Sequence, residues 1–280
     1  MKKIITLLII TSTYLFSSLH VIASILPEET FIKAIGGDRV NVSLMVLPGN
    51  SPHTYEPKPS QMKEVARATL YFAIGVEFEN VWLPKFKNLN TKMHIVDVTE
   101  GIKKRLMHTA HAHLHETEKM LDPHVWTSPA NVKIIAHNIY KALIKADPDH
   151  QAYYQEHLKA FLKTITETDR QIKAILKYSP KGTKFMVFHP SWGYFAHDYG
   201  LIQLPVEIEG KNPKPRELIA LIKEAKRENI KAIFTQPEFS DTVAKTIANE
   251  LGIEVIKVSP MDAHWSQNLL NIAHAIAPKE

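Results

Sequence analysis

Short β-rich stretches alternate with helix-like stretches along this chain, and this alternation limits its fold more than any other feature. Strands are predicted at 21–25, 40–47, 69–74, 94–98, 184–188, 204–208, 232–235 and 254–258. Helices are predicted at 30–35, 58–67, 79–88, 129–145, 215–227, 241–251 and 266–277. Such alternation is typical of α/β proteins, in which mostly parallel sheets are covered by helices.

One long helical stretch, 148–178, lies between the two halves of this pattern. Asp147 is a suitable N-cap, and Pro148 suits the first helical position. Apolar residues recur along it at a spacing of three to four: Tyr154, Leu158, Phe161, Leu162, Ile165, Ile172, Ile175 and Leu176. The helix would be about 45 Å long. We therefore predict two α/β lobes, 21–146 and 180–280, joined by a rigid linking helix at 147–179. A long helix inside one domain is the alternative.

The N-terminus has the features of a secretory signal. Lys2 and Lys3 precede an apolar stretch, 4–16, that is too short to span a bilayer. We predict a signal peptide over residues 1–20, with cleavage somewhere within 17–23, and an exported, periplasmic protein. An uncleaved membrane anchor is the alternative.

The chain contains no cysteine. An exported protein of 280 residues can depend on its core instead of disulfides. Without cysteine there is no residue for N-terminal lipid attachment, so we expect a soluble protein, and any metal site must use histidines and carboxylates. The net charge of +5 comes from interspersed residues and does not indicate nucleic-acid binding.

Three histidines stand at positions where a ligand would be expected. His53 and His189 each follow a predicted strand, and ligands of open α/β sheets bind beyond the carboxyl ends of strands. His124 lies in a turn that leads into a helix. All three are flanked by proline, which restricts the backbone nearby. Together they favour a shared metal, although any one of them alone is more typical of a packed or surface histidine.

The sequence resembles the zinc-binding substrate-binding proteins of bacterial ABC importers. The resemblance runs from about Val21 to the C-terminus, and these motifs carry it: Ser51-Pro52-His53-Thr54-Tyr55-Glu56-Pro57, Asp122-Pro123-His124-Val125-Trp126, His189-Pro190-Ser191-Trp192-Gly193-Tyr194-Phe195, Ile208-Glu209-Gly210-Lys211, Gln236-Pro237-Glu238-Phe239-Ser240 and Ala23-Ser24-Ile25-Leu26-Pro27. The resemblance implies two lobes with a metal between them, and it implies that His53, His124 and His189 are ligands. It also implies a permease and an ATPase subunit as partners. We expect the protein itself to be a monomer.

The fourth ligand is the point at which the sequence departs from the family. The family usually has an aspartate directly after the last strand, where this chain has Ser259-Pro260-Met261. Asp262 is one candidate, and capping of the next helix is its alternative role. Water, Glu56 or Glu209 are other candidates. Three imidazoles with at most one carboxylate suit Zn²⁺ better than Mn²⁺, which prefers oxygen ligands. A manganese-binding member of the family remains an alternative.

A histidine-rich loop, 107–118, provides four further imidazoles: His108, His111, His113 and His115. Such tracts can hold metal loosely, and the resemblance implies an auxiliary metal loop. A solvated loop with incidental histidines is the alternative.

Two other classes of function fit the sequence less well. A zinc hydrolase would need a general base beside a metal-bound water, but the chain has no HExxH, G-x-S-x-G or Walker motif. Glu56 or Glu209 would be its first candidates. A surface adhesin is the second class, but the sequence contains no repeats and no strand pattern typical of a β-sandwich. We therefore predict a zinc-capture protein rather than an enzyme.

Overall fold

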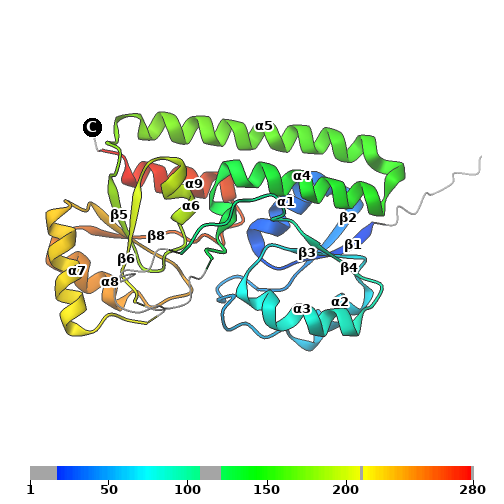
Figure 1. The fold of residues 1–280 in the computed structure, drawn as a ribbon, viewed down its shortest axis with the longest axis horizontal. Coiled ribbons are helices and arrows are strands. Elements are labelled where there is room, and N and C mark those ends of the chain that lie inside the picture. The colour runs from blue at the N-terminus through cyan, green and yellow to red at the C-terminus, as the bar shows by residue number, and fades with distance from the viewer. Residues whose placement is uncertain (1–17, 108–120, 209–210, 279–280) are drawn as a thin grey trace, which may run out of the picture.

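The computed structural model describes residues 18–107, 121–208 and 211–278, and it contains two lobes under one long helix (Figure 1). The strands are β1 Leu19–Ala23, β2 Val40–Leu44, β3 Leu70–Ala73, β4 His94–Asp97, β5 Lys184–Val187, β6 Ile202–Pro205, β7 Ala232–Thr235 and β8 Glu254–Lys257. The α-helices are α1 Leu26–Gly36, α2 Pro59–Arg67, α3 Glu77–Leu89, α4 Pro129–Ala146, α5 Gln151–Ile175, α6 Gly193–Asp198, α7 Pro215–Arg227, α8 Thr242–Leu251 and α9 Trp265–Ile276.

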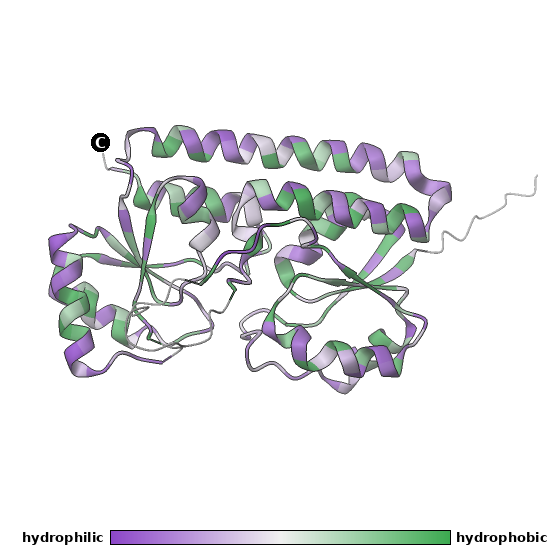
Figure 2. Ribbon diagram, viewed as in Figure 1, coloured by the Kyte–Doolittle hydropathy of each residue, from purple (hydrophilic) through white to green (hydrophobic). Residues whose placement is uncertain are grey.

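Each lobe contains a four-stranded parallel sheet, in the orders β2-β1-β3-β4 and β6-β5-β7-β8. In both sheets the second strand along the chain lies on one side of the first strand, and the third and fourth strands lie on its other side. This change of side creates a crevice at the carboxyl edge of the sheet. Figure 2 shows hydrophobic residues concentrated in the strands, whereas the outer helices mix the two kinds. The predicted α/β class with two parallel sheets is therefore confirmed.

The long helical segment spans 148–178 as predicted, but only its middle part is α-helical. Its α-helical part, α5, covers 25 residues, about 37 Å. Short 3₁₀ turns precede and follow it, at Pro148–His150 and Leu176–Tyr178. The Asp147 carboxylate does not cap the helix, because it accepts hydrogen bonds from the His150 ring and from the Tyr154 hydroxyl. The helix still runs along both lobes (Figure 1).

Several other boundaries differ from the prediction by a few residues. Strand β1 begins at Leu19, and β6 lies two residues earlier than expected. Helix α1 begins at Leu26 because Pro27 occupies its first turn, and the short helix α6 was missed. The proposed signal peptide falls almost entirely on residues 1–17, which lie outside the described residues. Among the residues that are described, no helix is both long and apolar enough to cross a membrane.

The two lobes are joined by direct contacts around Trp126 as well as by α5. The Trp126 indole donates to the carbonyl of Pro260, which follows the second sheet, over 2.8 Å. The Trp265 indole on α9 donates to the Trp126 carbonyl over 2.7 Å. The Trp265 ring also meets Phe31 of α1 edge to face, and Phe31 in turn packs against Phe161 of α5. The carboxyl edges of the two sheets are therefore held at a set separation.

A buried carboxyl group joins two turns at the carboxyl edge of the first sheet. Glu79 accepts hydrogen bonds from the Ser24 hydroxyl and from the backbone amides of Ile74 and Gly75. Burial raises its pKa to about 7, although these hydrogen bonds act in the opposite direction. Burial and the nearby Glu79 charge also raise the pKa of Glu28.

Replacing Trp265 tests the contacts between the lobes. Trp265→Phe keeps a ring against Phe31 but leaves the buried Trp126 carbonyl without its donor. We expect a loss of about 1–3 kcal/mol in the free energy of unfolding, measured by urea denaturation. Trp82→Phe on the half-buried face of α3 is the control and should cost less. A loss at Trp265 no larger than at Trp82 would contradict the stated role of these contacts.

The buried Glu79 carboxyl should make stability depend on pH. Because its pKa is raised in the folded state, its contribution is fully present below about pH 4.5 and is lost as the pH rises through about 7. Relative to wild type, Glu79→Gln should therefore be less destabilising at pH 8 than at pH 5, by up to about 3 kcal/mol. Urea denaturation of the metal-free proteins at both pH values measures this. The exposed Glu250→Gln variant should show no such difference.

Candidate metal centre

The structure brings His53, His124 and His189 together between the two lobes. The ring centres of His124 and His189 are 5.3 Å apart, and those of His53 and His189 are 5.5 Å apart. Three imidazoles bound to one tetrahedral zinc at about 2.0–2.1 Å would have ring centres about 5 Å apart. Both measured separations are therefore close to what a shared zinc ion requires.

Each ring reaches this position from a different kind of segment. His189 comes two residues after β5, where the Gln236 side chain hydrogen-bonds its backbone carbonyl over 3.1 Å. His124 lies just before the short turn that leads into α4. At the start of α4, the Ser128 hydroxyl caps the helix by accepting a hydrogen bond from the Asn131 amide. His53 lies in the longer β2–α2 loop. The Gln61 side chain binds the start of this loop at the Leu44 and Met45 carbonyls.

A carboxylate faces the Nδ1 atom of every one of the three rings. The distances are 2.8 Å from His124 to Asp122, 2.7 Å from His189 to Glu207 and 3.6 Å from His53 to Glu77. The first two pairs are buried, whereas the His53 side chain is 36% exposed. Two of the candidate rings are thus tightly held and the third is looser.

The rings surround a small pocket of about 30 Å³. A space of this size suits a single ion or a water molecule rather than an organic ligand. The buried Nε2 atom of His189 has no hydrogen-bond partner among the described residues, which is unusual for a buried polar atom. Within 18–107, 121–208 and 211–278, no group of three or more His, Asp or Glu side chains is arranged so that it could hold a metal ion. The rings must therefore move relative to one another before they can share an ion, and His53 is the most exposed of them.

Aromatic and apolar residues form a large part of the remaining pocket wall. Phe239 stacks on the His189 ring, with centres 5.1 Å apart, and Trp126 lies 5.3 Å from the His124 ring. Pro260 and Met261 complete the wall on the side of the second lobe. Of the other aromatic residues that flank the histidines in sequence, Tyr55, Trp192 and Tyr194 are buried but do not line the pocket.

The structure does not bring Asp262 into the pocket. Its carboxylate accepts a hydrogen bond from the backbone amide of His264 over 2.7 Å, and the side chain is 41% exposed. The bond orders the turn before α9, but Asp262 is not the helix cap that its alternative role required, because His264 occupies the N-cap position of α9. Glu56 is exposed and does not line the pocket either. Glu209 and the histidines His108, His111, His113 and His115 lie outside the described residues.

Sequence reasoning missed the carboxylates that do line or support the pocket. Glu77 and Glu238 are part of its wall, and Asp122 and Glu207 stand behind it. Two signals were present. Asp122 lies two residues before His124, and Glu207 follows β6 much as His189 follows the neighbouring β5.

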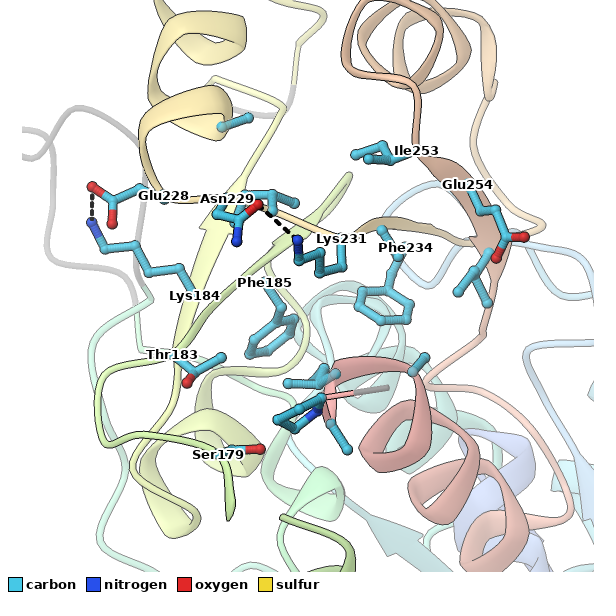
Figure 3. Close-up of a pocket in the computed structure, with 18 of the residues that line it drawn as sticks. Ser179, Thr183, Lys184, Phe185, Glu228, Asn229, Lys231, Phe234, Ile253 and Glu254 are labelled. Carbon is cyan, nitrogen blue, oxygen red and sulfur yellow. Dashed lines mark hydrogen bonds and ion pairs between the residues drawn. The ribbon is translucent and has the colours of Figure 1, made fainter. Parts of the chain in front are cut away.

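A second and larger hollow, of about 1430 Å³, lies in the second lobe (Figure 3). It is lined by the first residues of β5, β7 and β8 and is therefore at the amino edge of the sheet. Charged side chains around it pair locally, as Lys184 does with Glu228 over 3.0 Å. Ligands of open α/β sheets bind at the opposite edge, which favours the histidine pocket as the functional site.

Comparison with known proteins agrees with this geometry. The family model described as "Zinc-uptake complex component A periplasmic" (ZnuA) matches residues 21–276. The chain belongs to the ZnuA family. It is 31% identical over 244 residues to the high-affinity zinc uptake system protein ZnuA of Bacillus subtilis, covering 84% of this chain and 76% of the relative.

Two further matches extend the comparison. A manganese ABC transporter substrate-binding lipoprotein, scaA of Streptococcus gordonii, is 29% identical over 253 residues, with 85% of this chain and 78% of the relative covered. A crystal structure of ZnuA superposes with a TM-score of 0.85 and 41% identity, covering 93% of this chain and 99% of the other. Membership of the ZnuA family confirms the prediction of a metal-uptake binding protein rather than an enzyme.

Proposed function

We propose that this ZnuA-family protein captures Zn²⁺ outside the cytoplasm and delivers it to the permease of an ABC importer, which works with an ATPase subunit. The observation that carries the proposal is the convergence of three imidazoles, from segments far apart in sequence, at separations of 5.3 and 5.5 Å. His53, His124 and His189 are the proposed ligands. The protein acts as a periplasmic monomer after removal of a signal peptide within residues 1–20.

The donor set supports zinc over manganese. Three imidazole nitrogens suit Zn²⁺, whereas Mn²⁺ favours sites rich in oxygen. Since Asp262 is bonded to the backbone of the turn before α9, a fourth protein ligand would come from Glu77 or Glu238 in the pocket wall. Manganese binding remains the second candidate because a manganese-binding relative matches most of the chain.

Removing the three imidazoles should abolish tight zinc binding. For the triple variant His53→Ala, His124→Ala and His189→Ala, we expect loss of the one-to-one complex in calorimetry with a competing chelator. The matched control replaces three exposed histidines: His94, His137 and His274. Deletion of 107–118 should change the affinity little, because that loop is proposed as an auxiliary site. Tight binding that survives the triple replacement but is lost on loop deletion would reverse the two roles.

Zinc should stabilise the folded protein, because the proposed ligands come together only in the native state. At a free zinc concentration of 100 times the Kd, the free energy of unfolding should rise by about 2.7 kcal/mol. Thermal melting in zinc-buffered solution, repeated after chelation, measures this increase. Equal stabilisation by Mn²⁺ at the same free concentration would instead favour manganese as the cargo.

A further inference from the structure

We propose that Glu207 and Asp122 are positioning residues for zinc: each carboxylate holds the Nδ1–H of its histidine, so that the Nε2 atom is presented to the metal. This inference rests on the proposed zinc site and assigns a role to two residues outside the ligand set. Neither carboxylate needs to touch the ion.

The geometry around His189 is the first support. The Glu207 carboxylate lies 2.7 Å from Nδ1, and both side chains are buried. A carboxylate in this place accepts a hydrogen bond, which puts the ring proton on Nδ1 and leaves the lone pair on Nε2. The Nε2 atom is the buried ring nitrogen that lacks a partner among the described residues. A ligand lone pair is thus prepared before metal arrives.

The surroundings of Asp122 give independent support. Its Oδ1 atom accepts from both the backbone amide and the ring of His124, over 2.9 and 2.8 Å. The Tyr194 hydroxyl from α6 donates to the Asp122 carbonyl over 3.1 Å. A Cβ atom at Gly193 would lie 2.5 Å from Asp122 Oδ2, too close to be accommodated without movement. The second lobe therefore leaves room for this carboxylate and holds its backbone.

Charge gives these carboxylates a second effect. Three neutral imidazoles leave a bound Zn²⁺ with its full charge, in a site where two of the rings are less than one tenth exposed. Buried charge is costly unless it is offset nearby. A carboxylate behind each ring increases the basicity of the ligand and offsets part of that charge. The effect of ring orientation can be separated from the effect of charge by replacing glutamate with glutamine. Glutamine keeps a hydrogen-bond acceptor for the ring but has no negative charge.

The test compares zinc affinities of Glu207→Gln and Glu207→Leu by chelator competition. Loss of such a supporting group typically costs about 10–100-fold in metal affinity. We expect Glu207→Leu to lose zinc affinity at the upper end of this range. Glu207→Gln should have an affinity between those of Glu207→Leu and wild type, because the amide oxygen can still accept the hydrogen bond. Asp147→Asn, in the remote pair with His150, is the matched control and should leave affinity unchanged. Leucine and wild-type affinities within threefold of each other would overturn the proposal.

A spectroscopic readout separates positioning from general damage. Long-range ¹H–¹⁵N spectra of the metal-free protein should show His189 protonated at Nδ1 in wild type and in Glu207→Gln, and a shift towards Nε2–H in Glu207→Leu. Lost affinity with an unchanged tautomer would overturn the inference. If wild type itself fails to bind one zinc ion, the proposed function fails instead. The glutamine variant, which preserves side-chain shape, keeps the test available if the leucine variant does not fold.

Gly193→Ala tests Asp122 without changing any charge. The added methyl must displace the Asp122 carboxylate, and we expect about a 10-fold weaker zinc complex together with a changed His124 tautomer. Gly182→Ala, at a φ of +82° and with the Ile202 side chain at 3.9 Å from the added Cβ, controls for glycine replacement and backbone strain in the same lobe and should leave zinc affinity unchanged. Equal zinc affinity of Gly193→Ala and wild type would contradict the role of Asp122.

Discussion

The hydrogen bonds around Trp126 are the constraint on which the rest of the structure depends. Trp126 follows His124 by two residues, and its indole and carbonyl both bind segments that follow β8. The same residue therefore lies beside one of the proposed ligands and ties the first lobe to the second. With the long α5 lying along both lobes, this arrangement keeps the two carboxyl edges at one separation. The histidines from the two lobes are therefore kept near one another.

The rest of the protein does not constrain the three histidine rings equally. His124 and His189 are buried, are held by carboxylates at 2.8 and 2.7 Å, and each pack against an aromatic ring. His53 is more exposed, and its carboxylate is 3.6 Å away. Because the lobes are tied together, the His53 ring, on the β2–α2 loop, is the least constrained of the three. This asymmetry fits a carrier, which must release its cargo as well as bind it.

Much of the fold could be predicted from the sequence, because strand and helix periodicities are local properties. The α7 prediction at 215–227 matches its bounds, and the apolar face of α5 is buried largely as expected. The 3₁₀ turn that precedes α5 could not be predicted from periodicity, and Asp147 binds His150 and Tyr154 instead of capping the helix. The histidines were identified from strand ends and prolines, but Glu207 and Glu77 depend on tertiary contacts that periodicity does not report. Asp262 was chosen by nearness in sequence, whereas its loop turns the carboxylate towards His264.

X-ray absorption at the zinc edge, on protein loaded with one equivalent of Zn²⁺, tests the central claim most directly. The account predicts three imidazole nitrogens at about 2.0–2.1 Å, with the multiple-scattering pattern of histidine rings. In the variant lacking the His53 ring, one imidazole should disappear from the spectrum. A zinc shell dominated by oxygen, or one that keeps three imidazoles without His53, would contradict a metal shared by these three histidines.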